Sequence, residues 1–212
     1  MVQPSRRGII FIVSGPSGVG KSTLCAAIVS AMPQVRMSVS CTTRRPRPGE
    51  VNGREYWFVS EDDFQRMVQE GAFIEWAQVH GHYYGTLWRE VRQAQEEGMD
   101  LVLDIDVQGA RQLMAKISES VSLFVLPPSL DVLTQRLRRR AMDAPDEIAR
   151  RLQAAQREIA HYAAYQYIIY NDELDQAMMA FQSVIRAERL RTTRVDRAWL
   201  IKVGLLPNSI ES

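Results

Sequence analysis

Short apolar runs alternate along the chain with segments in which apolar residues recur at helical spacing. Continuous apolar runs are typical of parallel strands that helices cover on both faces. The predicted strands cover residues 9–13, 35–39, 101–105, 122–126 and 167–170. The predicted helices cover residues 21–32, 107–117, 130–140, 146–163 and 175–192. This alternation predicts an α/β fold in which helices cover both faces of a parallel sheet.

Residues 39–87 interrupt this alternation. Prolines, glycines and arginines fill residues 42–55, which predicts a loop. Ser60 and Asp63 have the spacing of a capping box and predict the start of a helix. Residues 73–84 alternate aromatic with polar side chains, which predicts strands. We therefore expect one compact unit that contains an insertion.

The composition indicates a globular chain with balanced charge. Of the 212 residues, 46% are hydrophobic, and 26 Lys and Arg oppose 25 Asp and Glu for a net charge of +1. This balance argues against a protein that follows a nucleic-acid backbone, so any phosphate chemistry must be local. Residues 9–13 are too few for a signal peptide or for a membrane span of about 20 residues. Cys25 and Cys41 lack zinc-site spacing, so we expect a reduced, cytoplasmic protein without membrane or nucleic-acid partners.

Residues 15–22 read Gly-Pro-Ser-Gly-Val-Gly-Lys-Ser and fill every fixed position of the GxxxxGK[ST] pattern. Glycines let backbone N–H groups converge on phosphate oxygens, and the start of the next helix adds partial positive charge. Lys21 neutralises phosphate charge, and the Ser22 hydroxyl is a ligand for Mg²⁺. Because a strand precedes the motif and a helix follows it, a nucleoside triphosphate site is favoured over an empty glycine-rich turn.

Residues 40–56 combine arginines and a tyrosine on a loop that prolines stiffen. A guanidinium presents a planar fork to phosphate, so a pair of arginines beside a phenol suits a second phosphate site. A solvated basic loop is the alternative on this segment alone.

Glu75 shares one strand face with Phe73 and Ala77, so its carboxylate needs a partner. Guanine offers N1–H and N2–H₂ side by side, and one carboxylate accepts both hydrogen bonds, whereas adenine cannot make this pair. Tyr83, Tyr84 and Thr86 follow nearby with hydroxyls for a base or a phosphate. Ordinary aromatic packing and a turn are the alternative for these last residues.

Asp104 and Asp106 follow the apolar run 101–103. Ligands of open α/β sheets bind beyond the carboxyl ends of the strands, and residues two apart share one strand face. Two neighbouring carboxylates repel unless a cation or donor is close. These acids are therefore candidates to hold Mg²⁺, to orient the acceptor or to bind guanine, with capping of the strand end as the alternative.

Six motifs together resemble the guanylate kinase family, from about residue 8 to residue 194. They lie, in the family's order, at residues 15–23, 40–53, 73–77, 83–86, 103–109 and 170–172. The resemblance implies a P-loop NTPase-type sheet and in-line transfer of the γ-phosphoryl group of Mg-ATP to GMP and dGMP. The products are then ADP and GDP or dGDP, with Mg²⁺ as the cofactor.

The resemblance also implies the site residues. The ATP site comprises Gly15, Pro16, Ser17, Gly18, Val19, Gly20, Lys21, Ser22, Thr23 and Asn171. The GMP contacts are Ser40, Glu75, Thr86 and Asp104 at the base and Arg44, Arg47, Tyr56 and Tyr84 at the phosphate. The catalytic residues are Lys21, Arg44, Arg140 and Arg151. Ser22 binds Mg²⁺, with Asp104 or Asp106 contributing through water.

By the same resemblance, residues 1–212 form a single unit of four parts. They are a core at 8–38 and 88–194, a GMP-binding insertion at 39–87, a lid at about 136–151 within the core range, and a tail at 195–212. A lid arginine that closes over the transferred group stabilises its charge and excludes water.

Three other functions compete with the kinase interpretation. Guanylate-kinase-like interaction modules of scaffold proteins characteristically lack a working P-loop, whereas Lys21 and Ser22 are intact here. Another nucleoside monophosphate kinase needs a base pocket other than the one that Glu75 and Asp104 suggest. A GTPase switch typically has an N-K-x-D motif, which the sequence lacks. Oligomeric state and the choice between GMP and dGMP stay open at this level.

Overall fold

The computed structural model describes residues 6–79, 81–140 and 145–207 of the 212. Its larger sheet has five parallel strands in the order β2-β7-β1-β8-β9. These strands are β1 (Ile10–Ser14), β2 (Val35–Met37), β7 (Asp100–Asp104), β8 (Val121–Leu126) and β9 (Tyr167–Tyr170). The parallel sheet of an α/β fold is thus confirmed, and each predicted strand lies within two residues of its expected bounds.

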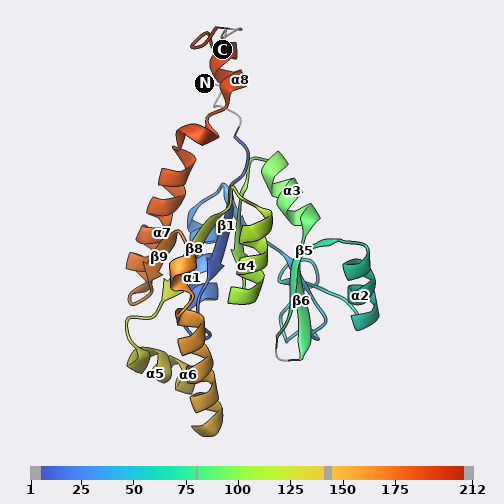
Figure 1. Ribbon diagram of the computed structural model, residues 1–212, viewed down its shortest axis with the longest axis vertical. Coiled ribbons are helices and arrows are strands. Elements are labelled where there is room, and N and C mark those ends of the chain that lie inside the picture. The colour runs from blue at the N-terminus through green and yellow to red at the C-terminus, as the bar shows by residue number, and fades with distance from the viewer. Residues whose placement is uncertain (1–5, 80, 141–144, 208–212) are drawn as a thin grey trace.

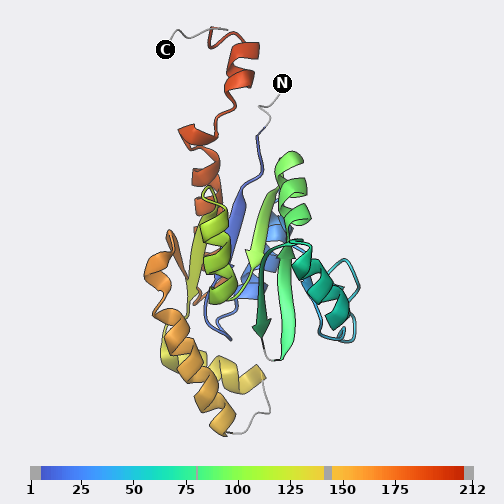
Figure 2. The ribbon, with the colours of Figure 1, turned by 45° about the vertical axis from the view of Figure 1, so that its right-hand side comes forward.

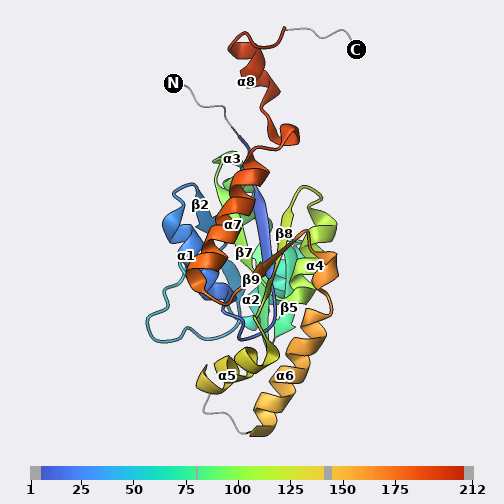
Figure 3. The same cartoon turned by 90° about the vertical axis from the view of Figure 1, so that its left-hand side faces the viewer.

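Helices cover both faces of this sheet, as the apolar runs predict. Phe11 and Val13 of β1 face one helical layer, α1 and α7, whereas Ile10 and Ile12 face the other, α3 and α4. Because successive strand residues point to opposite faces, a strand between two layers must be apolar throughout. The four helices are α1 (Lys21–Ala31), α3 (Trp88–Glu96), α4 (Val107–Lys116) and α7 (Leu174–Arg189). Figure 3 shows α1 and α7 on one side of the strands and α4 on the other.

The insertion forms a second sheet beside the first (Figure 1). Its strand order is β4-β3-β6-β5, with β3–β6 and β5–β6 antiparallel and β3–β4 parallel. Helix α2 packs on it through Phe64 and begins after Ser60, whose Oγ accepts a hydrogen bond from Asp63 N, so the predicted helix start is confirmed. The elements are β3 (Ser40–Thr42), β4 (Tyr56–Phe58), α2 (Glu61–Gln69), β5 (Phe73–Val79) and β6 (His82–Leu87).

Two helices, α5 (Leu130–Arg140) and α6 (Pro145–Ile159), project from the end of the molecule toward which β1 runs (Figures 1 and 2). They pack on each other through Leu133, Leu137 and Ala155. The expected lid at about 136–151 includes the end of α5 and the first half of α6. The remaining elements are the 3₁₀ turns η1 (Tyr162–Ala164) and η2 (Thr192–Arg194) and helix α8 (Arg197–Lys202). Within the described ranges, no helix is long and apolar enough to cross a bilayer.

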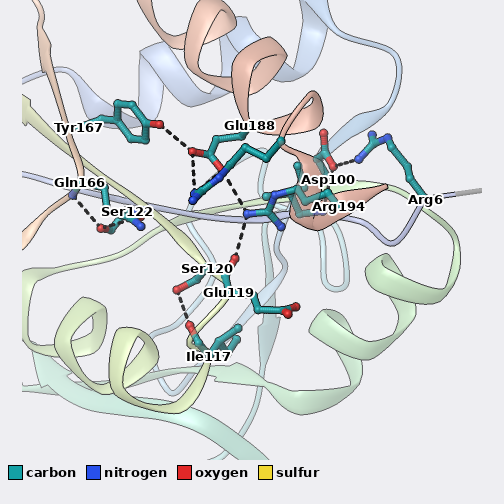
Figure 4. A network of polar contacts seen from close by, with 12 residues as sticks. Arg6, Asp100, Ile117, Glu119, Ser120, Ser122, Gln166, Tyr167, Glu188 and Arg194 are labelled. Carbon is teal, nitrogen blue, oxygen red and sulfur yellow. Dashed lines mark hydrogen bonds and ion pairs between the residues drawn. The ribbon is translucent and has the colours of Figure 1, made fainter. Parts of the chain in front are cut away.

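Buried ion pairs tie the opposite end of the sheet together (Figure 4). Asp100, the first residue of β7, is fully buried, accepts a hydrogen bond from Ile9 N at 2.9 Å and pairs with Arg6 and Arg189. Glu188 of α7 is also buried, and it accepts the Tyr167 hydroxyl hydrogen bond at 2.6 Å. Its carboxylate also pairs with Arg191 and Arg194. These contacts fix Arg6 and the end of α7 onto the sheet.

Candidate active site

Residues 15–20 form the loop between β1 and α1. Gly18 and Gly20 have φ angles of +86° and +95°, which favour glycine over residues with a side chain. Gly20 must also lack a side chain because a Cβ there would lie 2.5 Å from Asn171 Nδ2. The expected phosphate-binding loop therefore has the strand, loop and helix context that its chemistry requires.

Lys21 and Ser22, the first residues of α1, meet the carboxylate of Asp104. Lys21 Nζ lies 3.1 Å from Oδ1, and Ser22 Oγ donates a hydrogen bond of 2.5 Å to Oδ2. Mg²⁺ prefers oxygen ligands such as hydroxyl and carboxylate groups. Ser22 and Asp104 therefore fit the Mg²⁺ ion that is expected beside a triphosphate. Asp106 has another role, because its Oδ1 caps α4 by accepting a hydrogen bond from Gly109 N at 2.7 Å.

Asn171, directly after β9, is hydrogen-bonded to the loop of residues 15–20. Its Nδ2 donates to Val19 O at 2.8 Å. Arg136 of α5 donates to the same carbonyl at 3.2 Å and to Asn171 O at 2.8 Å. A hollow of about 290 Å³ is lined by Gly18, Gly20, Thr23, Arg136, Asn171, Asp172 and Leu174. This hollow adjoins the phosphate loop, where the base of a bound nucleotide is expected.

Arg44 lies in the insertion, in a cluster of aromatic and acidic groups. Its two terminal nitrogens donate to Glu50 Oε2 at 3.0 Å and Oε1 at 2.9 Å, and this pairing raises the pKa of Arg44. The guanidinium also lies 5.4 Å from the ring centre of Tyr56, which packs edge-on against Tyr84. Burial, followed by the negative charge of Asp104, raises the pKa of Tyr56. Tyr56 thus connects the Arg44 cluster electrostatically to the phosphate loop.

Arg47 and Ser40 are less closely joined to this cluster. Arg47 is exposed, and its backbone N–H donates to Glu50 Oε2 at 2.7 Å. Ser40 begins β3 and pairs in parallel register with Tyr56. Glu50 was not singled out from the sequence, although an acid six residues after Arg44 was an available signal.

Glu75 of β5 is only 5% exposed. Its Oε1 accepts a hydrogen bond of 2.6 Å from the Thr86 hydroxyl on β6, so the carboxylate has the partner that its strand face demands. Burial raises the pKa of Glu75 to about 7, against the lowering effect of the Thr86 hydrogen bond. Tyr83, by contrast, stacks on Phe64 in the core of the insertion, as ordinary aromatic packing predicts.

Helix α6 reaches the phosphate loop through two side chains. Arg151 Nη2 lies 3.4 Å from Ser17 Oγ, and Glu158 Oε2 accepts a hydrogen bond from Ser17 N at 3.2 Å. Arg140 is the last residue of α5, but its side chain lies outside the described part of the structure. Sequence reasoning missed Glu158 and the contacts of Arg136, because their partners lie between 35 and 141 positions away along the chain, where no local spacing marks them.

The fold and this loop define a P-loop NTPase-type α/β protein with a second polar cluster on an inserted sheet. Comparison with known proteins narrows the class. The family model for guanylate kinase matches residues 6–188. The guanylate kinase of Geobacter sulfurreducens is 50% identical over 190 residues, which cover 90% of this chain and 94% of that protein. That of Escherichia coli K12 is 47% identical over 89% of this chain and 92% of its own length.

A solved structure agrees with the sequence matches. The crystal structure of guanylate kinase from Anaplasma phagocytophilum has a TM-score of 0.78 and 31% identity, and the match covers 99% of this chain and 100% of that one. The chain therefore belongs to the guanylate kinase family. The family resemblance inferred from the six motifs is confirmed.

Proposed function

We propose that this protein transfers the γ-phosphoryl group of ATP to GMP, forming ADP and GDP. Membership of the family supports the reaction. The observation that carries the choice of acceptor is the buried Glu75 carboxylate beside Thr86 on the inserted sheet. A carboxylate in this environment accepts hydrogen bonds from guanine N1–H and N2–H₂, and adenine leaves it unpaired.

The reaction needs positioning and charge neutralisation more than a general base. The backbone of residues 15–20 holds the phosphates of ATP, and Lys21 neutralises their charge. Arg44 with Tyr56, Tyr84 and Arg47 holds the phosphate of GMP, so that its oxygen lies in line with the γ-phosphorus. Support for this arrangement comes from the pKa of Tyr56, which burial and then the negative charge of Asp104 raise, because the charge of Asp104 acts on Tyr56 only if the two groups are near each other.

Mg²⁺ fits the Ser22 and Asp104 oxygens, and when bound it neutralises charge on the triphosphate. Asp104 also forms an ion pair with Lys21. We therefore propose that Asp104 contributes both to the GMP site and to the ATP site. Arg151, together with Arg140, is proposed to close over the transferred group and exclude water. The contact of Arg151 with Ser17 supports this role.

The proposed parts are the insertion at 39–87, which takes GMP, and a lid at about 136–151, within a core of 8–38 and 88–194. Asn171 is proposed to contribute to the adenine site through the hollow beside Gly20. Use of dGMP, cytoplasmic location, and the expected lack of nucleic-acid and membrane partners stay predictions. The 195–212 tail is assigned no role in the reaction.

Product analysis tests the proposal. ATP, Mg²⁺ and GMP are incubated with the full chain, and the nucleotides are separated by ion-exchange chromatography. We expect ADP and GDP to form in equal amounts, and the Lys21→Ala variant to form neither at a comparable rate. ADP that accumulates with inorganic phosphate and without GDP would show an ATPase instead.

A further inference from the structure

Gly109 lies in the first turn of α4, three residues after the capping residue Asp106. It is buried, and its backbone belongs to the regular helix Val107–Lys116, so its conformation does not require glycine. Glycine within a helix costs about 1 kcal/mol relative to alanine. Glycine therefore weakens the helix at a position where the backbone does not require it. We infer that a neighbouring group occupies the space that a side chain would take.

The space is taken by the carboxylate of Glu75. A Cβ at Gly109 would lie 2.6 Å from Glu75 Oε2, closer than unbonded atoms approach, and 3.2 Å from its Cδ, which is a tight contact. The other oxygen of that carboxylate, Oε1, accepts the Thr86 hydrogen bond at 2.6 Å. The Glu75 carboxylate is therefore confined between Thr86 on β6 and the first turn of α4.

The helix cannot move away from β5 without breaking other contacts. Gln112 Nε2 donates to Trp76 O at 3.0 Å, and Lys116 Nζ donates to Ile74 O. Both residues lie on α4, and both acceptors flank Glu75 on β5. A methyl group at position 109 would therefore displace the Glu75 side chain, whose terminal carboxylate is the most mobile of the atoms that meet it.

We propose that Gly109 is a specificity-determining position that acts through Glu75. Its missing side chain leaves the carboxylate of Glu75 aligned to accept both N–H groups of a guanine base. This inference rests on the proposed function, because it assigns a supporting residue to the same GMP site. Gly109 is a positioning residue, since its effect on the base passes through Glu75.

The test compares the Gly109→Ala variant with the wild-type chain by isothermal titration with GMP and by steady-state kinetics. We expect GMP to bind about 10- to 100-fold more weakly, because small displacements of aligned groups have effects of this size. KM for ATP should stay within about twofold of the wild type, and the ratio of kcat/KM for GMP over AMP should fall. Arg111→Ala, an exposed change on α4, is the control and should leave all values unchanged.

A second background shows whether the effect passes through Glu75. In a Glu75→Ala chain there is no carboxylate to displace, so adding Gly109→Ala should cause no further loss of GMP affinity. If the Tm of the Gly109→Ala variant falls, the Gly109→Ala, Glu75→Ala double variant should recover it, because the second change removes the carboxylate that the new methyl group meets. The inference is overturned if Gly109→Ala binds GMP like the wild type, if both variants unfold, or if the loss persists without Glu75.

These outcomes are separate from failure of the proposed function. A wild-type chain that neither binds nor phosphorylates GMP overturns both the function and the inference. A wild-type chain that phosphorylates GMP, with a Gly109→Ala variant that does so equally well, overturns the inference alone.

Discussion

The Ser22 hydroxyl donates a hydrogen bond of 2.5 Å to Asp104, which joins the start of α1 to the end of β7. Lys21 meets the second oxygen of the same carboxylate at 3.1 Å. The sheet register produces this meeting, because Val13 of β1 lies beside Asp104 in the parallel β1–β7 pair. One carboxylate thus orients the first two side chains of α1, which we propose to bind the triphosphate and Mg²⁺.

Replacing Asp104 with Asn keeps the shape of the side chain but removes its charge. Lys21 then loses its ion pair, and the triphosphate site loses an anionic oxygen. We expect kcat/KM to fall at least about 100-fold, the size typical of losing a preorganised polar contact in an active site. Circular dichroism and thermal melting should show a folded chain. Asp175→Asn, an exposed change on α7, is the control, and activity of Asp104→Asn within about threefold of that control would contradict the role.

Arg44 tests the acceptor-phosphate site. Lysine keeps the charge but lacks the planar fork with which Arg44 holds both oxygens of Glu50 and, in the proposal, the phosphate. We expect Arg44→Lys to raise KM for GMP about 10- to 100-fold, equivalent to about 1.5–3 kcal/mol, with KM for ATP unchanged.

The matched control for Arg44 is Arg54→Lys on the same loop. Arg54 pairs with Glu55, and its side chain is 64% exposed. Initial-rate kinetics with GMP as the varied substrate should therefore show the wild-type KM for this variant. A wild-type KM for both variants would mean that the loop acts only through its net charge, and equal increases in KM would mean that Arg44 has no role that Arg54 lacks.

Glu75 predicts a pH dependence of stability in the chain without nucleotide. Its pKa is about 7 in the folded protein, against an ordinary value of 4.5. Between these values the folded state holds a proton that the unfolded state releases, so the free energy of unfolding should fall as pH rises from about 4.5 to about 7. Urea denaturation at several pH values measures this slope. The Glu75→Gln variant should lack this part of the fall, and parallel curves for the two proteins would refute the assignment.

Asp100 tests whether the buried ion pairs of Figure 4 serve stability alone. Asp100→Asn leaves Arg6 and Arg189 without their buried carboxylate. We expect the free energy of unfolding to fall by about 3–5 kcal/mol, the usual result of breaking a buried pair.

The kinetics of Asp100→Asn at 25 °C should stay normal, because Asp100 lies at the first residue of β7, whereas the proposed active site lies at the last residue of this strand, Asp104. Glu55→Gln, which breaks the exposed pair with Arg54, should cost less than about 1 kcal/mol. A stable Asp100→Asn chain with impaired kinetics would mean that this end of the sheet contributes to the reaction.

Local patterns predicted most of the fold, and the exceptions share a physical cause. Helix α3 was not predicted because its buried face combines only two apolar residues, Val91 and Ala94, with the charged Glu90, which is too little to mark a helical period. Glu90 is buried because it pairs with Arg36 at 3.1 Å, a contact between residues 54 positions apart. Helix α8 is only six residues long and has no buried side chain, so no apolar periodicity marks it.

In the candidate site too, local patterns predicted some residues and missed those whose contacts depend on distant segments. Lys21 and Ser22 follow from a motif whose spacing is local, and Asp104 from its place at the end of an apolar run. Strand alternation predicts that Glu75 needs a partner, and the structure identifies that partner as Thr86. The clamp of Arg136 on the Val19 and Asn171 carbonyls depends on how distant segments pack, so spacing alone carries no signal for it.

The acceptor specificity of the purified chain tests the central claim most directly. ADP formation from Mg-ATP is measured with GMP, AMP, CMP and dTMP in parallel and without an acceptor. We predict ADP formation with GMP, and kcat/KM for GMP about 10⁴-fold above that for AMP, because the wrong base leaves the buried Glu75 carboxylate unpaired. Comparable efficiencies with GMP and AMP, or ADP formation at the same rate without any acceptor, would contradict the account.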